Sequence, residues 1–168
     1  MYRVAVITSS DKGAAGERED KSGGIICDMV KQKGFQMVST MILPDEKELL
    51  KQHMKLICDQ NQADLILTTG GTGFSPRDVM PEATAEIAQK LVPGISEAMR
   101  YGAMQITKRA MLSRGISAIR EATLIINLPG SPKAVRESLE FILDELDHGL
   151  AILTGKATKC AREDKING

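Results

Sequence analysis

The apolar residues of this chain fall into two kinds of pattern that alternate along the sequence. Short apolar runs predict strands over residues 4–7, 37–43, 65–69, 117–120 and 123–127. Between them, apolar residues recur every three or four positions and predict helices around residues 25–30, from 44 to 57, over about 82–90 and 94–108, and from 131 to 146. A further turn or two is expected between residues 148 and 156. This alternation indicates the α/β class.

The strand-like runs also indicate how the sheet is built. A strand that is apolar on both faces, such as Leu65–Leu67, belongs in a sheet that helices cover on both sides. The last two strands are separated only by Glu121 and Ala122, and so short a connection requires an antiparallel pair. We therefore predict a mostly parallel but mixed sheet in one domain, residues 1–156, followed by a polar tail, residues 157–168.

Composition narrows the range of partners. The 22 lysines and arginines balance the 22 aspartates and glutamates, and only two tyrosines and three phenylalanines are available to stack on bases. A nucleic-acid-binding protein normally carries a basic excess, because it must neutralise backbone phosphates. Nucleic acid is therefore not an expected partner, whereas a phosphorylated small molecule is compatible with this composition. No apolar stretch approaches the roughly 18 residues of a membrane-spanning helix, so we expect no membrane partner.

The cysteines indicate a reducing compartment. Cys27, Cys58 and Cys160 are far apart and form no CxxC pair, and the chain has two histidines. A disulfide framework or a zinc site needs more ligands at closer spacing, so we interpret the cysteines as small core residues. The chain also begins with a strand-like segment and shows no signal-peptide pattern, which predicts a cytoplasmic protein.

Polar residues gather where the predicted strands end. Four segments follow strand-like runs: residues 9–11, 43–46, 68–82 and 127–133. In an open α/β sheet, ligands bind beyond the carboxyl ends of the strands, where loops lead into helices. We therefore expect one crevice to gather all four segments.

The strongest local signal is the glycine-rich segment Thr68–Gly73. Its three glycines lie within four positions, which permits a sharp turn and exposes successive N–H groups to an anion such as phosphate. A tight turn after a buried strand explains the glycines alone equally well. Arg77 and Asp78 follow in the same loop and favour the phosphate site, because phosphate and Mg²⁺ chemistry requires a cation and a carboxylate.

Two widespread phosphate-binding motifs are not matched. The dinucleotide motif GxGxxG fails because Pro76 stands where the third glycine belongs. Residues 16–22 contain a Lys-Ser pair like the one that ends a Walker A pattern, but Asp20 occupies the second glycine position. Glu17 and Glu19 would also place negative charge where the phosphates lie, so we set this segment aside as a phosphate loop.

Four further positions suit an anionic substrate. Asp45 and Asp78 each lie between a strand end and a helix, and two such carboxylates can share a Mg²⁺ ion that bridges phosphate oxygens. Helix N-capping is the alternative role for each of them. Lys133 lies in the first turn of the last helix, where a cation opposes the helix dipole unless an anion docks nearby. Arg114, after Ser113, is either a phosphate clamp or part of a surface turn.

Together these segments resemble a known family. Residues 68–84, Thr-Thr-Gly-Gly-Thr-Gly-Phe-Ser-Pro-Arg-Asp-Val-Met-Pro-Glu-Ala-Thr, closely resemble the signature of the molybdopterin-binding family, which includes the bacterial MogA and MoaB proteins and the gephyrin G domain. Further segments agree with the family in the same order: residues 6–11, 20–23, 43–46, 112–114 and 126–133. The resemblance extends from about residue 3 to residue 146.

The resemblance implies a three-layer α/β sandwich, assembled as a homotrimer or a hexamer. The activity it implies is molybdopterin adenylyltransfer, in which AMP passes from MgATP to the molybdopterin phosphate and pyrophosphate is released. It assigns catalysis and Mg²⁺ binding to Asp45 and Asp78. It assigns the nucleotide and its phosphates to Asp11, Asp20, Ser22, Gly23, Gly70, Gly71, Thr72, Gly73 and Glu82. It assigns molybdopterin to Arg77, Ser113, Arg114, Pro129, Gly130, Ser131 and Lys133.

Both substrates are anions, and Arg77 or Arg114 is expected to offset their repulsion together with Mg²⁺. Two other functions remain open at this point. The first is a molybdopterin carrier, which needs the glycine loop and Lys133 but not both metal carboxylates. The second is a nucleotide pyrophosphatase similar to the competence-damage proteins.

Overall fold

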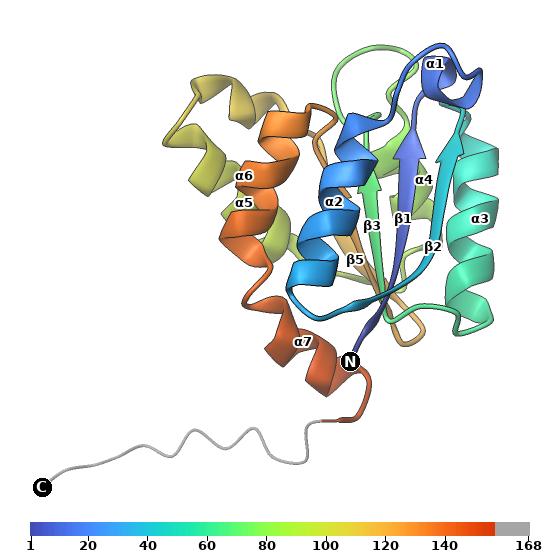
Figure 1. Ribbon diagram of the computed structural model, residues 1–168, viewed down its shortest axis with the longest axis vertical. Coiled ribbons are helices and arrows are strands. Elements are labelled where there is room, and N and C mark those ends of the chain that lie inside the picture. Colours follow the sequence, from blue (N-terminus) through green and yellow to red (C-terminus); the bar gives the residue numbers. More distant parts are fainter. Residues whose placement is uncertain (157–168) are drawn as a thin grey trace, which may run out of the picture.

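The computed structural model describes residues 1–156 of the 168-residue chain, so the predicted polar tail and Cys160 lie outside the described residues. Six strands form one sheet in the order β2-β1-β3-β6-β5-β4 (Figure 1). The strands are β1 (Arg3–Ser9), β2 (Gln36–Leu43), β3 (Leu65–Thr69), β4 (Lys90–Leu91), β5 (Ser117–Arg120) and β6 (Thr123–Leu128). The pairs β1–β2, β1–β3 and β3–β6 are parallel, whereas β5 is antiparallel to β4 and β6. The α/β class with a mixed sheet is confirmed.

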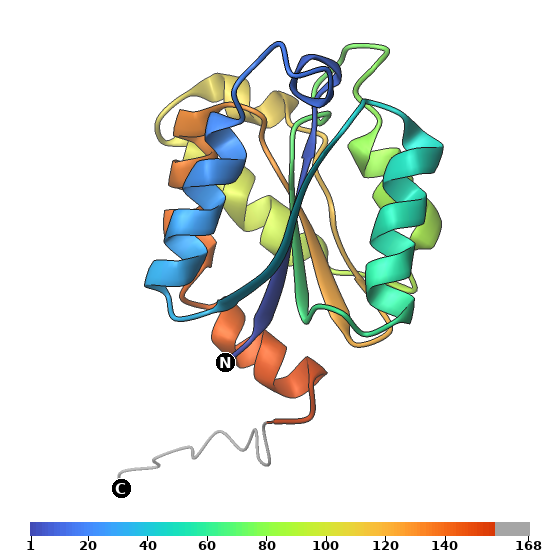
Figure 2. The same ribbon diagram turned by 45° about the vertical axis from the view of Figure 1, so that its right-hand side comes forward.

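Helices cover both faces of this sheet (Figure 2). The long helices are α2 (Lys21–Gln32), α3 (Lys47–Asp59), α4 (Met80–Ile87), α5 (Pro93–Met104), α6 (Pro132–Ile142) and α7 (Leu146–Leu153). Two shorter helices are α1 (Asp11–Ala14) and the 3₁₀ helix η1 (Lys108–Leu112). Residues of α2, α5, α6 and α7 share one buried core with the sheet, and residues of α3 and α4 share the other. The fold is therefore the three-layer sandwich that the resemblance implied.

The central strands are apolar throughout because each of their faces packs against a helical layer. Along β1, Val4 and Val6 belong to the core beneath α2 and α6, whereas Ala5 and Ile7 belong to the core beneath α3 and α4. Every residue of β3 and β6 is buried in the same way. Two hydrophobic layers thus hold the middle of the sheet, and polar residues gather at the ends of its strands.

Local capping sets where two helices of the α2–α6 layer begin. The Asp20 side chain accepts a hydrogen bond from Gly23 N at 2.8 Å and caps α2. Ser131 caps α6 by accepting from Ala134 N at 3.2 Å, and Pro132 occupies the first turn, where its missing N–H has no cost. The start of α6 agrees with the sequence pattern, which placed the beginning of that helix at residue 131.

Several predicted boundaries were wrong. The helix expected over residues 82–90 ends at Ile87, because residues 90–91 pair with β5 as a short edge strand. The helix expected over 94–108 ends at Met104, and residues 108–112 form η1 instead. Apolar spacing did not separate these pieces, since a short edge strand depends on a partner strand that lies far along the chain.

The C-terminal helix and the first loop also differ from the prediction. The apolar spacing continues from α6 to Leu146 and predicted one helix. In the structure α6 ends at Ile142, and a separate helix, α7, begins at Leu146. Residues 11–14 form the helical turn α1, with Ser10 as its N-cap, where the sequence pattern predicted no helix. Among the described residues, no helix combines the length and apolar character needed to cross a bilayer.

Asp64, just before β3, carries a buried charge that is fully paired. Asp64 is 5% exposed, and its carboxylate accepts from Arg3 N and Arg3 Nη2, both at 2.8 Å. Burial alone would raise the pKa of Asp64, but the hydrogen bonds from Arg3 outweigh it, so this pKa lies below its usual value. The pair ties the start of β1 to the start of β3.

The variant Asp64→Asn should lower the free energy of unfolding by about 1.5–3 kcal/mol at pH 7, because Arg3 loses its charged partner. A depressed carboxylate pKa contributes stability above the unfolded value, and this contribution is lost as the pH falls through the lower folded value. The difference in the free energy of unfolding between wild type and variant should therefore become smaller below about pH 4. Urea unfolding at several pH values measures this, with the exposed Asp28→Asn as control; equal midpoints at pH 7 would contradict the prediction.

Candidate active site

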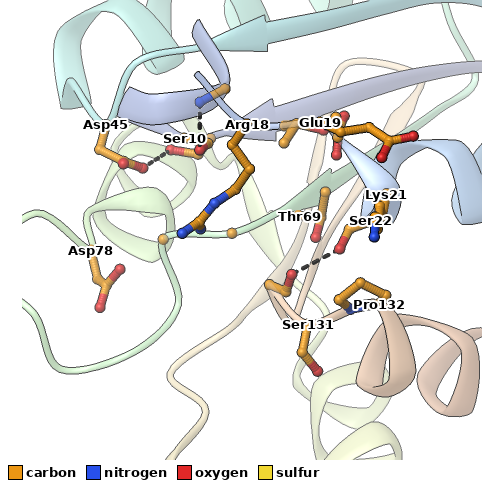
Figure 3. Close-up of a pocket in the computed structure, with 17 residues that line it drawn as sticks. Ser10, Arg18, Glu19, Lys21, Ser22, Asp45, Thr69, Asp78, Ser131 and Pro132 are labelled. Carbon is orange, nitrogen blue, oxygen red and sulfur yellow. Dashed lines mark hydrogen bonds between the residues drawn. The ribbon is translucent and has the colours of Figure 1, made fainter. Parts of the chain in front are cut away.

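A cavity of about 860 Å³ opens at the carboxyl ends of the parallel strands (Figure 3). Segments far apart in the sequence line it. They are residues 8–10 after β1, the loop before α2, Asp45 after β2, the glycine turn after β3, Asp78, and the segment between β6 and α6. In Figure 3, Asp45 and Asp78 lie on one side of the cavity, and Ser22 and Pro132 lie on the other. The predicted crevice therefore exists.

The cavity gathers some of the predicted site residues and not others. Those that line it are Asp20, Ser22, Asp45, Gly70, Gly71, Asp78, Gly130 and Ser131. Those outside its lining are Asp11, Gly23, Thr72, Gly73, Arg77, Glu82, Ser113, Arg114, Pro129 and Lys133. Ser113 and Pro129 line a neighbouring cavity of about 220 Å³ between α5, η1 and α6. Lys133 faces Glu137 on its own helix, at 3.8 Å.

Asp45 is held by the loop that follows β1. Its carboxylate accepts hydrogen bonds from Ser9 Oγ and, at 3.0 Å, from Asp11 N. In return, Asp45 N donates to Asp11 Oδ1 at 2.9 Å. The N-cap of α3 is Glu46, so Asp45 does not have the capping role that its sequence position also suggested. Its carboxylate instead lies at the cavity in an orientation set by two strand ends.

Arg77 completes this arrangement from the glycine loop. Its Nε and Nη2 donate to the two carboxylate oxygens of Asp11, at 3.0 and 2.7 Å. The guanidinium of Arg77 lowers the pKa of Asp11, helped by the hydrogen bond from the Asp45 backbone. The Arg77–Asp11 pair thus joins the loop after β3 to the loop after β1, and the positive charge of Arg77 is already compensated.

The glycine turn is required by close approach of the backbone. Gly70 has φ +89°, and a Cβ there would lie 2.3 Å from the carbonyl oxygen of Ser9. Gly71 also has positive φ, at +65°, and a Cβ there would lie 3.3 Å from Met80 Cβ. The tight-turn interpretation of these glycines is therefore correct, and the turn also forms part of the cavity wall.

Asp78 is positioned by its own loop and by Arg114. One carboxylate oxygen of Asp78, Oδ2, accepts from Ser75 N at 2.8 Å. Arg114 donates from Nε to the carbonyl oxygen of Gly73 at 2.7 Å and from Nη2 to that of Asp78 at 2.6 Å. Arg114 also pairs with Glu82, and this hydrogen bond lowers the pKa of Glu82. Arg114 therefore clamps the loop that presents Asp78, and its charge is compensated as well.

The opposite side of the cavity is joined by side-chain hydrogen bonds to backbone oxygens. Ser22 Oγ donates to the carbonyl oxygen of Gly130 at 2.8 Å, and Thr69 Oγ1 donates to that of Pro129 at 2.6 Å. Asp20 accepts from Thr8 Oγ1 at 2.6 Å in addition to capping α2. The segment at residues 129–131 is thereby fixed between the start of α2 and the end of β3.

The sequence profile of the family described as "Probable molybdopterin binding domain" matches residues 5–148, most of the chain. The protein belongs to this family. A molybdopterin adenylyltransferase of Helicobacter pylori is 37% identical over 154 residues, covering 90% of this chain and 88% of that protein. A molybdopterin adenylyltransferase of Escherichia coli K12 is 35% identical over 145 residues, covering 84% of this chain and 74% of that protein. The structure of the molybdopterin biosynthesis enzyme MoaB from Thermus thermophilus superposes with a TM-score of 0.88 at 46% identity. The match covers 95% of this chain and 100% of that one. The suspected family is confirmed.

Within this molybdopterin-binding fold, the cavity contains residues that the sequence reasoning did not select. These are Arg18, Glu19 and Lys21, which line it from the loop before α2, whereas Ser9 and Ser10 belong to a segment that was expected at the crevice. The first three belong to the segment that was set aside as a failed Walker A motif. Their position next to Asp20, which was selected, is a sequence signal by which they could have been found.

The turn in this member of the molybdopterin-binding family should not tolerate a side chain at residue 70. Gly70→Ala should lower the free energy of unfolding by about 2 kcal/mol or more, because alanine resists positive φ and its Cβ meets the Ser9 carbonyl. Gly24→Ala is the matched control: this residue lies in α2 with open space around it, and alanine there should stabilise by about 0.5–1 kcal/mol. Thermal unfolding of the two variants measures the difference. Equal changes in the melting temperature of Gly70→Ala and Gly24→Ala would contradict the role of the turn.

Proposed function

We propose that this protein is a molybdopterin adenylyltransferase of molybdenum cofactor biosynthesis, an enzyme that transfers AMP from ATP to the molybdopterin phosphate and releases pyrophosphate. Relatives that carry this name match most of the chain. The observation that carries the proposal is the meeting of Asp45, Asp78 and the Gly70–Gly71 turn in one cavity large enough for phosphorylated substrates.

The reaction brings two anions together, and this is its main physical difficulty. A phosphate oxygen of molybdopterin attacks the α-phosphorus of ATP, and the bond from that phosphorus to the bridging oxygen of pyrophosphate breaks. A phosphate monoester is already an anion, so no side chain is needed to remove a proton from it. The protein must instead orient the two substrates and stabilise the charge of the transition state.

Asp45 and Asp78 fit a Mg²⁺ ion that arrives with the nucleotide. Among residues 1–156, no group of three or more acidic, histidine or cysteine side chains could hold a metal ion by itself. Mg²⁺ commonly takes one or two carboxylates and completes its shell with water and substrate phosphates, which matches two aspartates at one cavity. When bound, the ion would neutralise phosphate charge and orient the oxygens.

The main cavity and its smaller neighbour suggest where each substrate lies. The nucleotide is assigned to the glycine turn, Asp20 and Ser22. Molybdopterin is assigned to Gly130 and Ser131, next to the smaller cavity that Ser113 and Pro129 line. In this arrangement Arg77 and Arg114 shape the loop around Asp78 and do not contact substrate. We infer that the reaction takes place in the cytoplasm, where the free thiols of Cys27 and Cys58 remain reduced.

Pyrophosphate release tests this function. The wild type should release pyrophosphate from MgATP only when molybdopterin is added. Asp45→Ala and Asp78→Ala should each slow the release about 100-fold or more, because the metal and the charge it stabilises are lost, while circular dichroism shows an intact fold. Pterin binding without pyrophosphate release would support a carrier instead. Release without pterin would support a nucleotide pyrophosphatase.

We also propose a homotrimer, with a hexamer as the alternative. Its support is a set of apolar side chains exposed on α5, η1 and the segment between them, Tyr101, Met104, Ile106, Met111 and Leu112. Sedimentation velocity should show three 18.2 kDa chains together, and Tyr101→Lys with Met111→Lys should dissociate them. Ile152→Lys, at an apolar residue of α7 that is also more than half exposed, is the control. A monomeric wild type would contradict this proposal.

A further inference from the structure

The cavity holds more negative than positive charge before any substrate enters. Four carboxylate side chains line it, from Glu19, Asp20, Asp45 and Asp78, against two cationic side chains, Arg18 and Lys21. ATP and the molybdopterin phosphate would add further negative charge. One Mg²⁺ ion held by two aspartates leaves much of that charge uncompensated, so positively charged side chains have to contribute.

The sequence suggested Arg77 and Arg114 as the positive charges that offset the substrates, but both already bind carboxylates of the protein. Arg77 is bidentate to Asp11, and Arg114 binds Glu82 and two carbonyl oxygens of the glycine loop. Freeing either guanidinium would expose a carboxylate that it neutralises and would release the loop carrying Asp78. Neither residue lines the cavity. The compensating charge therefore has to come from another side chain.

Arg18 is in the right place and is unpaired. It forms no hydrogen bond or ion pair with any of residues 1–156, although its side chain lines the cavity. In Figure 3 the side chain extends from the loop before α2 across the cavity, and its guanidinium lies on the side of Asp45, away from Pro132. An exposed arginine with acidic groups nearby and no fixed partner is available to a ligand.

We propose that Arg18 binds the β- and γ-phosphates of ATP and stabilises the pyrophosphate leaving group; this rests on the adenylyltransferase function proposed above. In phosphoryl transfer the attacking and leaving oxygens are roughly in line through the reacting phosphorus. Molybdopterin is assigned to the side of Gly130 and Ser131, so pyrophosphate leaves toward the opposite side. The guanidinium of Arg18 lies on that side.

The chemistry of the step suits a guanidinium. As the new bond forms between the molybdopterin phosphate oxygen and the α-phosphorus, the electron pair of the broken bond moves onto the bridging oxygen of pyrophosphate. Arginine remains protonated and presents several N–H donors in a planar fork, which matches two phosphate oxygens at once. A lysine in its place would keep the charge but lose the second hydrogen bond.

Binding of α,β-methylene-ATP and of AMP, each with Mg²⁺, separates this role from a general effect on the site. Arg18→Gln should weaken α,β-methylene-ATP binding about tenfold or more, the effect of losing a charged hydrogen bond. AMP binding should stay within about twofold, because AMP lacks the two outer phosphates. Arg18→Lys should recover part of the affinity. Isothermal titration calorimetry measures all of these constants.

Arg136→Gln is the matched control, because Arg136 is exposed on α6 and outside the cavity lining. It should leave both dissociation constants unchanged. Unchanged α,β-methylene-ATP binding in Arg18→Gln would overturn the inference, as would an equal loss for both nucleotides or a wild type that does not bind α,β-methylene-ATP. The two proposals can also fail separately. If Arg18→Gln loses affinity only for α,β-methylene-ATP but the wild type shows no pterin-dependent pyrophosphate release, the role of Arg18 is upheld and the transferase function is refuted.

Discussion

Parallel pairing in the middle of the sheet is the constraint on which the site depends. The register places Ser9 opposite Leu43, Thr8 opposite Thr69, and Thr69 opposite Leu128. Because four parallel strands end at one level, the loops that follow them meet at one edge of the sheet. Asp45, the glycine turn and the Gly130–Ser131 segment become neighbours for this reason, and the two hydrophobic layers on either side keep the strands in place.

Charge at this edge serves two separate purposes. Arg77 and Arg114 each bind a carboxylate and join one loop to another, so their contribution is to the shape of the site. Arg18 and Lys21 carry charge into the cavity without such pairing. A paired arginine contributes little field to an incoming anion, whereas an unpaired one is free to reorganise around it. Arginines close together in the sequence or the fold can thus have very different roles.

The glycine loop shows that a structural and a functional interpretation need not compete. Gly70 and Gly71 adopt positive φ because the turn runs against the Ser9 carbonyl and Met80, which is sufficient reason for both glycines. The same compact turn leaves space for the cavity beside β3. It also starts the loop that brings Asp78 back toward Asp45. A structural requirement at Gly70 therefore also shapes the wall of the cavity.

The sequence by itself determined the α/β class, the mixed sheet, the start of the last helix at Ser131, and the family, because these depend on short-range patterns and on an ordered set of motifs. It also indicated Asp45 and Asp78. Helix ends such as Ile87 and Ile142 depended on distant packing, as did the edge strand at residues 90–91. Only the tertiary structure decided which charges are paired. Asp11 pairs with Arg77, and Glu82 pairs with Arg114. The partners lie in segments far apart along the chain, so the sequence could not show that they touch. That pairing removes two arginines from the cavity and leaves Arg18 in it.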